Sequence, residues 1–184
     1  MRVFVLDINF EKDDRSGKFY PWITGRLKSG LEIKIQNFFY DLQGYIGHHV
    51  EMLLCVLRSP YLEFKKGMND QPFLSEKYYS IELIEELKER KGFNSKDNET
   101  KRMMITGEFI DSYIIPQEWM PLIKSQWFKS VLKEPSAINT DDGIFLLYSF
   151  HLRKRVPIER FPKIVTIATG CIDLAAWHPL SASE

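Results

Sequence analysis

The sequence lacks the features of secreted, disulfide-bonded and membrane-spanning proteins. Its 184 residues include only two cysteines, Cys55 and Cys171. Both lie in apolar runs, which favours two buried, reduced thiols. The apolar run at the start is too short for a signal peptide and is not followed by a small-residue cleavage site. No stretch approaches the roughly 18 uninterrupted apolar residues of a membrane span. These absences predict a cytoplasmic protein with no membrane partner.

Signatures of nucleotide and metal cofactors are absent as well. Only ten glycines occur, and they form neither a phosphate-cradling loop nor a dinucleotide-binding fingerprint. No serine lies in a nucleophile elbow. His48 and His49 are adjacent and would point to opposite faces of a strand, and no cysteine lies within ligand spacing of another. We therefore expect no cofactor, no metal ion and no catalytic residue.

The chain also lacks net charge. Lysine plus arginine total 25, as do aspartate plus glutamate. This balance argues against a protein that coats nucleic acid by bulk electrostatics, although a local basic patch remains compatible with it. Aromatic residues are abundant instead, with 13 Phe and 8 Tyr, and they favour pleated, half-buried strands. Length and composition together predict one β-rich α+β domain over residues 1–184.

The first ten residues alternate with the period of a strand. Phe4, Leu6, Ile8 and Phe10 fall on one face, and Asp7 and Asn9 fall on the other. This pattern predicts a half-buried strand over residues 2–10.

A β-hairpin is the best-defined local feature. A three-residue loop, Lys28-Ser29-Gly30, gives the only register that keeps the faces consistent, because a slip of one residue moves every side chain to the other face. Gly30 also supplies the left-handed conformation that such a loop needs at its third position. The register pairs Leu27 with Leu31, Arg26 with Glu32, Thr24 with Lys34, Trp22 with Gln36 and Tyr20 with Phe38.

The remaining elements follow from apolar runs, caps and turn residues. They are a central strand at 50–58, a loop at 59–73, a helix at 80–91 capped by Ser80, a strand at 102–115 interrupted at Gly107, a helix at 121–133 with Ile123, Trp127, Val131 and Leu132 on one face, a turn at Asp141-Asp142-Gly143, and strands at 144–152 and 163–173.

The order of these elements resembles that of an OB-type barrel. In that resemblance, residues 19–58 give the first three strands, the helix at 80–91 bridges, and later strands close the sheet. We therefore predict a mostly antiparallel sheet that closes into an OB-like barrel, about residues 19–173, with two flanking helices. The strand at 2–10 and the helix at 121–133 would be additions to this core.

One face of the hairpin interleaves aromatic and basic residues. Bases of single-stranded nucleic acid stack on such rings at about 1–3 kcal/mol each, while cations follow the phosphates. We expect Tyr20, Trp22 and Phe38 to stack bases and Arg26 and Lys34 to contact phosphates. The alternative is that this face packs beneath another element, such as the N-terminal strand or the second predicted helix.

A basic run follows the predicted strand at 144–152. Arg153, Lys154 and Arg155 would form a phosphate-contacting loop at the end of that strand. The alternative is a solvated strand end whose charges discourage aggregation.

Acidic residues near the hairpin permit a nuclease hypothesis. Glu32-x-Lys34, with Asp13 or Asp14 upstream, has the carboxylates that would hold Mg²⁺ and a lysine that would steady a phosphate. The pattern has low specificity, because residues 63–65 repeat it. The predicted register also places the Glu32 carboxylate in an ion pair across the hairpin.

Asp173 is an ionisable residue inside an apolar segment. Its carboxylate must be paired or have a raised pKa. It would lie either at a functional cleft or at a strand end, where backbone N–H groups bind it.

These observations lead to three ranked hypotheses. The first is a non-enzymatic OB-like module that binds single-stranded DNA or RNA through the hairpin face. The second is a protein–protein interaction module, such as a complex subunit or an inhibitor, because aromatic residues are enriched at interfaces. The third is a metal-dependent nuclease.

Overall fold

The computed structural model describes residues 1–12, 17–56, 65–66, 73–77, 102–147, 164–169 and 172–180. Strands dominate these ranges. The strands are β1 (Arg2–Lys12), β2 (Phe19–Arg26), β3 (Glu32–Gln36), β4 (His49–Val56), β5 (Lys65–Lys66), β6 (Phe73–Lys77), β7 (Arg102–Ile110), β8 (Ser136–Thr140), β9 (Gly143–Leu147), β10 (Ile164–Thr169) and β11 (Ile172–Pro179). The short helices are η1 (Gln43–Tyr45) and η3 (Gln117–Leu122), both 3-10, and the α-helix α2 (Gln126–Val131).

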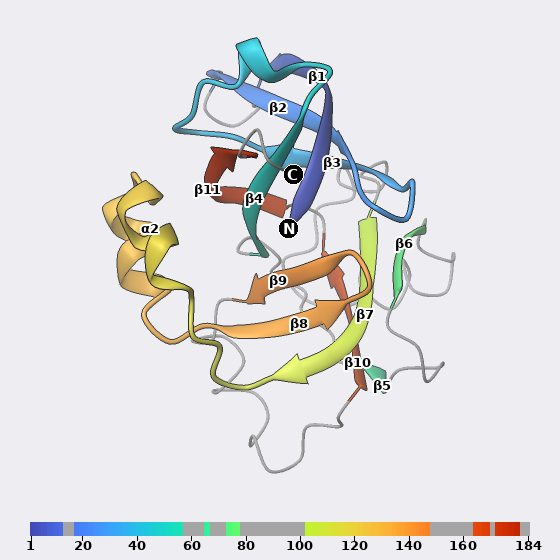
Figure 1. Ribbon diagram of the computed structural model, residues 1–184. Coiled ribbons are helices and arrows are strands. Elements are labelled where there is room, and N and C mark those ends of the chain that lie inside the picture. The colour runs from blue at the N-terminus through green and yellow to red at the C-terminus, as the bar shows by residue number, and fades with distance from the viewer. Residues whose placement is uncertain are drawn as a thin grey trace.

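Five strands close into a barrel. β1, β2, β3, β11 and β4 lie side by side in that order, and β4 returns to pair with β1. β11 runs parallel to β3, while the other barrel pairs are antiparallel. Figure 1 shows the five strands together in one half of the molecule. The predicted fold class, an OB-like α+β barrel with short helices, is confirmed.

The barrel uses only part of the predicted set of strands: β2, β3 and β4 come from residues 19–58 as expected, but the other two strands differ. β1 is one of its five strands, so the N-terminal strand is not an addition to the core. The fifth strand is β11, which begins at the end of the predicted strand at 163–173. The earlier part of that segment gives β10, and the predicted strand at 144–152 gives β9, both outside the barrel. The reason is that strand order depends on pairing between distant segments, which local periodicity does not encode.

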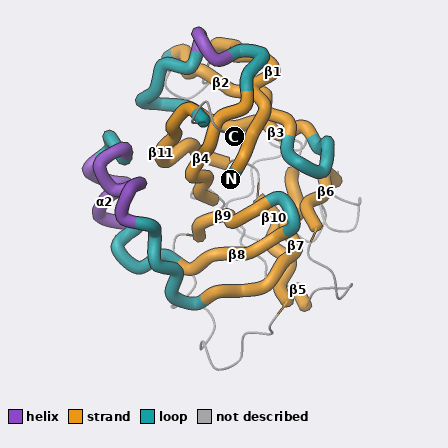
Figure 2. The backbone as a smooth tube through the Cα atoms, viewed as in Figure 1, coloured by secondary structure: helices purple, strands orange, loops and turns teal. Residues whose placement is uncertain are grey.

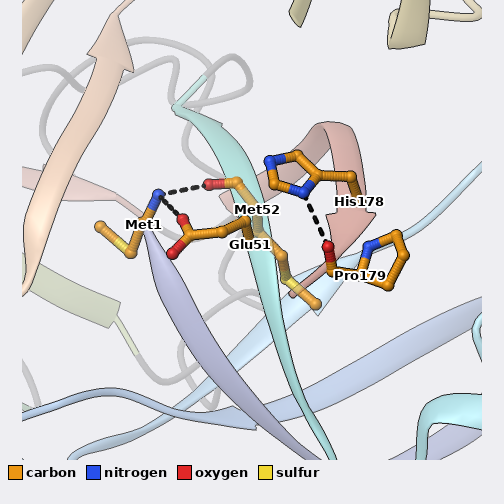
Figure 3. Close-up of polar contacts among 5 residues, drawn as sticks. All are labelled: Met1, Glu51, Met52, His178 and Pro179. Atoms are coloured by element: carbon orange, nitrogen blue, oxygen red, sulfur yellow. Dashed lines mark hydrogen bonds and ion pairs between the residues drawn. The ribbon is translucent and has the colours of Figure 1, made fainter. Parts of the chain in front are cut away.

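The barrel closes where β1 meets β4. Val3 pairs with Val50 in this short antiparallel ladder. The amino group of Met1 lies 3.0 Å from a carboxylate oxygen of Glu51 and donates to the carbonyl of Met52 at 2.9 Å (Figure 3). Nearby on β11, Nδ1 of His178 lies 2.9 Å from the carbonyl oxygen of Pro179 (Figure 3).

A β-bulge in β1 overturns the predicted burial of that strand. Val5 pairs with Gly25 and Asp7 with Thr24, so Leu6 is an extra residue between them. The buried residues are therefore Val3 and Val5 before the bulge and Ile8 after it, whereas the predicted face included Phe4, Leu6 and Phe10. A bulge shifts the inward face by one residue, and simple alternation cannot anticipate it.

The predicted hairpin register is confirmed in β2 and β3. Arg26 pairs with Glu32, Thr24 with Lys34 and Trp22 with Gln36. The loop is closed by a hydrogen bond from the Leu27 amide to the Leu31 carbonyl at 2.9 Å. Gly30 has a φ of 89°, in the left-handed region expected of a glycine there.

The same hydrogen-bonded sheet continues from the barrel through β4, and we call this extension the second sheet. Residues 54–56 of β4 pair in parallel with β9, and the order continues through β8, β7 and β10 to β5. β6 pairs separately with β7. Figures 1 and 2 show β7, β8 and β9 beside the barrel and α2 on one flank of the molecule.

The predicted helix at 121–133 is largely replaced by shorter elements. Pro116 precedes the 3-10 helix η3, and the Ser125 side chain caps α2 by accepting from the Phe128 amide at 3.3 Å. Phe128 and Leu132 are buried, while Trp127 is 52% exposed. The predicted apolar face was therefore wrong at Trp127, because the chain enters α2 at Ser125 rather than at Pro121.

Several other boundaries also differ. Residues 163–173 give two strands rather than one, and β5 and the start of β6 fall within the predicted loop at 59–73. β8 was not anticipated; Asp141-Asp142 then turn the chain into β9, as predicted. The predicted helix at 80–91 with its cap Ser80, and the residues after Leu147 in the strand at 144–152, lie outside the described residues.

Two apolar clusters lie on opposite faces of β4. Met52, Leu54 and Val56 belong to the cluster that fills the barrel and continues under the second sheet. Leu53 and Cys55 belong to the other cluster, which segment 113–132 covers through Trp119, Phe128 and other apolar side chains. β4 is buried on both faces, as predicted for residues 50–58, of which 57–58 lie outside the described residues.

Candidate nucleic-acid interface

The predicted hairpin face lies on the outside of the barrel. Ile23, Ile33 and Ile35 point into the core, and the residues that alternate with them lie on the other face, where Gln36 is itself buried. Arg26 and Lys34 are exposed. Tyr20, Trp22 and Phe38 are half-buried, so the face is only partly covered. The N-terminal strand lies beside this face rather than over it, because β1 pairs with the edge of β2.

Both cations of the hairpin face lie in ion pairs. Arg26 lies 2.9 Å from Glu32 on β3, and Lys34 lies 2.7 Å from Glu11 on β1. The four side chains are roughly half exposed, between 46% and 63%. Exposed pairs of this kind contribute at most about 1 kcal/mol, so they can exchange partners. They nevertheless neutralise the face in the unliganded protein.

A run of aromatic rings extends this face toward α2. Tyr20 and Phe38 are 5.1 Å apart between ring centroids, and Phe38 and Phe39 are 6.0 Å apart. Phe39 lies 6.2 Å from Phe128, which lies 5.5 Å from Trp127. We call these five residues the aromatic ridge, in which Phe128 is buried and packs beneath the exposed rings of Phe39 and Trp127. Phe39 is 45% exposed and Trp127 52% exposed, so the ridge presents two large apolar surfaces to solvent.

Sequence reasoning found only part of the ridge. It identified Tyr20 and Phe38, and their rings do meet, although the strand ladder ends at Trp22 and Gln36. It did not identify Phe39, and it assigned Trp127 to a buried helix face. The adjacent aromatic residues at 38–40 were an available signal, because consecutive aromatic residues cannot all point into one core.

Tyr40 attaches segment 113–132 to the barrel. Its hydroxyl donates toward the carbonyls of Leu122, at 3.0 Å, and Ala175 on β11, and it accepts from the Lys124 amide at 3.1 Å. Burial raises the pKa of Tyr40, and the Lys124 N–H partly offsets that rise. The phenol is therefore neutral at physiological pH and available as both donor and acceptor.

Lys124 places a cation beside the ridge. Its Nζ lies 3.3 Å from the carbonyl oxygen of Phe39 and 5.1 Å from the centroid of the Tyr40 ring. Within the described part of the chain its ammonium group makes no ion pair with a carboxylate. It differs in this respect from Arg26 and Lys34, whose positive charges are neutralised.

Asp173 is buried within the sheet. It is 1% exposed and lies in register with Cys55 on β4 and with Gln36 on β3. The pKa of the Cys55 thiol is raised well above its usual value, first by burial and then by the Asp173 charge. Cys55, its partner on β4, belongs to the apolar cluster that segment 113–132 covers.

The nuclease pattern gains no described metal site. The carboxylate of Glu32 forms an ion pair with Arg26. Asp13, Asp14 and Glu63 lie outside the described residues. No group of three or more His, Cys, Asp or Glu side chains among the described residues could hold a metal ion. The basic run at 153–155 also lies outside the described residues.

No described helix is both long and apolar enough to cross a membrane. Comparisons with protein-family models, with curated proteins and with solved structures found no match to the chain. The fold and the ridge are therefore the basis for any functional argument.

Proposed function

We propose that this chain is a non-enzymatic binding module for single-stranded nucleic acid. Its binding surface is the aromatic ridge, continued by the outer face of β2 and β3. The observation that carries the proposal is the position of Lys124, whose ammonium group lies 3.3 Å from the Phe39 carbonyl, beside a ring that is 45% exposed. An exposed ring with an adjacent cation provides stacking for a base and a contact for its phosphate.

The position of the ridge on the barrel supports the same ligand. OB-fold proteins bind oligonucleotides on the face of their second and third strands. In this chain those strands are β2 and β3, and the ridge begins at Tyr20 on β2 and at Phe38, in the loop that follows β3. A strand laid along the ridge would then pass from the hairpin to Trp127 on α2.

The ion pairs of the hairpin determine how steeply oligonucleotide affinity should fall with salt concentration. Arg26 and Lys34 must leave Glu32 and Glu11 before they can contact phosphates, whereas Lys124 needs no such exchange. The log of affinity falls with the log of salt concentration by about 0.7 for each phosphate neutralised on a single strand. With one to three such contacts, the slope should be modest.

A protein partner is the second candidate. The same ion pairs favour it, because they leave the hairpin face electrically balanced, and exposed Phe39 and Trp127 are residue types enriched at interfaces. This alternative predicts a partner whose affinity is nearly indifferent to salt.

The test is a fluorescence-anisotropy titration with labelled oligonucleotides of about 12 nucleotides, a length within the site sizes of single OB folds. Single-stranded DNA, single-stranded RNA and a duplex should be compared at about 50 and 200 mM salt. Binding to single strands that weakens with salt, with weaker binding to the duplex, is expected. No binding at the lower salt concentration would exclude the nucleic-acid proposal.

A further inference from the structure

The hydroxyl of Tyr40 connects three segments that are far apart in the chain. Tyr40 follows β3, Leu122 and Lys124 flank the end of η3, and Ala175 lies on β11. A phenolic hydroxyl has one hydrogen and accepts through its oxygen. Here it accepts from the Lys124 amide at 3.1 Å, and its single hydrogen is shared between the carbonyl oxygens of Leu122 and Ala175.

The backbone of Tyr40 is held in place by the side chain of Asn37. The side-chain oxygen of Asn37 accepts from the Tyr40 amide at 3.0 Å, and the side-chain amide of Asn37 donates to the Tyr40 carbonyl at 2.7 Å. Asn37 is 1% exposed and Tyr40 8% exposed. The ring therefore belongs to the buried base of the ridge, although its neighbour Phe39 lies at the surface.

The hairpin side of the ridge and its α2 side meet beside Tyr40. Phe39 precedes Tyr40 and contacts Phe128, with ring centroids 6.2 Å apart. Lys124, whose backbone is bound by the Tyr40 hydroxyl, contacts the Phe39 carbonyl with its ammonium group. One hydroxyl thus fixes the position of the segment that carries the cation and leads into α2.

We propose that Tyr40 is the positioning residue of the ridge. Its hydroxyl holds Leu122 and Lys124 on the barrel, and this placement sets the Lys124 ammonium and Trp127 in line with Phe39 for one continuous single strand. The inference rests on the proposed function. It adds that the ridge is a composite surface, assembled by docking of segment 122–128 rather than built into the hairpin alone.

The experiment compares Tyr40→Phe with Tyr45→Phe. The first variant removes only the hydroxyl, and the second removes a hydroxyl from a tyrosine whose ring packs against Trp177 and the barrel core. Tyr40→Phe should weaken oligonucleotide binding by about three- to tenfold, the effect of one ordinary hydrogen bond. Tyr45→Phe should leave it unchanged. Equal affinities for the two variants would overturn the proposal.

A double-mutant cycle separates positioning from a general structural role. If Tyr40 acts by placing Lys124 and Trp127, its loss should cost little in a Lys124→Ala, Trp127→Ala background. Fully additive losses would mean that Tyr40 supports the fold without placing these groups, which contradicts the inference.

Amide hydrogen exchange tests the same contact without a ligand. The Lys124 amide should exchange faster in Tyr40→Phe and at the wild-type rate in Tyr45→Phe. If the wild-type protein binds no oligonucleotide, the proposed function fails, and the exchange result then decides the positioning role alone. Unchanged exchange at Lys124 in Tyr40→Phe would reject that role.

Discussion

The carboxylate of Asp142 accepts two hydrogen bonds from Ser29, a residue 113 positions earlier in the chain. Its Oδ1 accepts from the Ser29 amide at 2.7 Å and its Oδ2 from the Ser29 hydroxyl at 2.8 Å. The turn between β8 and β9 is thereby joined to the loop of the β2–β3 hairpin. Two turns that the sequence predicted separately form one contact between the barrel and the second sheet.

Asp142→Ala should destabilise the protein by about 1–3 kcal/mol, because it removes a buried acceptor and leaves the Ser29 amide without its partner. Urea unfolding followed by circular dichroism measures this loss. Asp141→Ala is the matched control, since Asp141 is an exposed neighbour in the same turn. Equal effects for the two variants would show that the link to Ser29 does not stabilise the fold.

Gly107→Ala should destabilise the second sheet. A Cβ at Gly107 would lie 2.3 Å from the carbonyl oxygen of Asn139 on β8, a backbone atom that cannot move aside easily. Overpacking of this kind costs about 1–3 kcal/mol. In contrast, Gly44→Ala meets no heavy atom within 4 Å and should be nearly neutral. Thermal unfolding of both variants distinguishes close approach from a general effect of replacing glycine.

Cys55 should be chemically inert in the folded protein. In a Cys171→Ser variant, the remaining thiol should react with a disulfide reagent only as fast as the protein opens, because the reactive species is the thiolate. Burial and the Asp173 charge raise the Cys55 pKa, so the folded state favours the protonated thiol. The protonated thiol therefore adds to the free energy of unfolding. This contribution is complete below the thiol pKa of the unfolded chain and is lost as the pH rises through the higher thiol pKa of the folded protein. Rapid reaction at neutral pH would contradict the buried position.

Glu11→Gln should strengthen oligonucleotide binding at low salt. The change releases Lys34 from its 2.7 Å ion pair, and the free ammonium adds one phosphate contact. The salt slope should therefore become steeper by about 0.7, while stability changes by less than about 1 kcal/mol. Glu118→Gln removes the same charge from the exposed surface of η3 and serves as the control. If both variants behave alike, the gain reflects net charge and not the release of Lys34.

Local features of the fold could be predicted where neighbouring residues determine them. The hairpin register followed from facial alternation and from Gly30, and the structure reproduces each ladder pair from Arg26–Glu32 to Trp22–Gln36. The barrel class followed from element order. Its composition did not, because the bulge at Leu6 and the pairing of β11 with β3 and β4 depend on contacts over long sequence separations.

The residues of the candidate site could likewise be predicted only where they are close in sequence. Tyr20 and Phe38 could be placed together because they share a hairpin. Phe39 and Trp127 could not, because their neighbourhood is created by the docking of segment 122–128 onto Tyr40. The ion pair of Arg26 was foreseen within the hairpin, whereas that of Lys34 with Glu11 required the position of β1.

The most direct test of the central claim compares oligonucleotide binding by wild-type protein, Phe39→Ala and Trp127→Ala. Both side chains are about half exposed, so their removal should leave stability nearly unchanged. Each loss should weaken binding of a single strand by about 1–3 kcal/mol if the ring stacks on a base. Wild-type affinity in both variants would contradict the assignment of the aromatic ridge as the nucleic-acid surface.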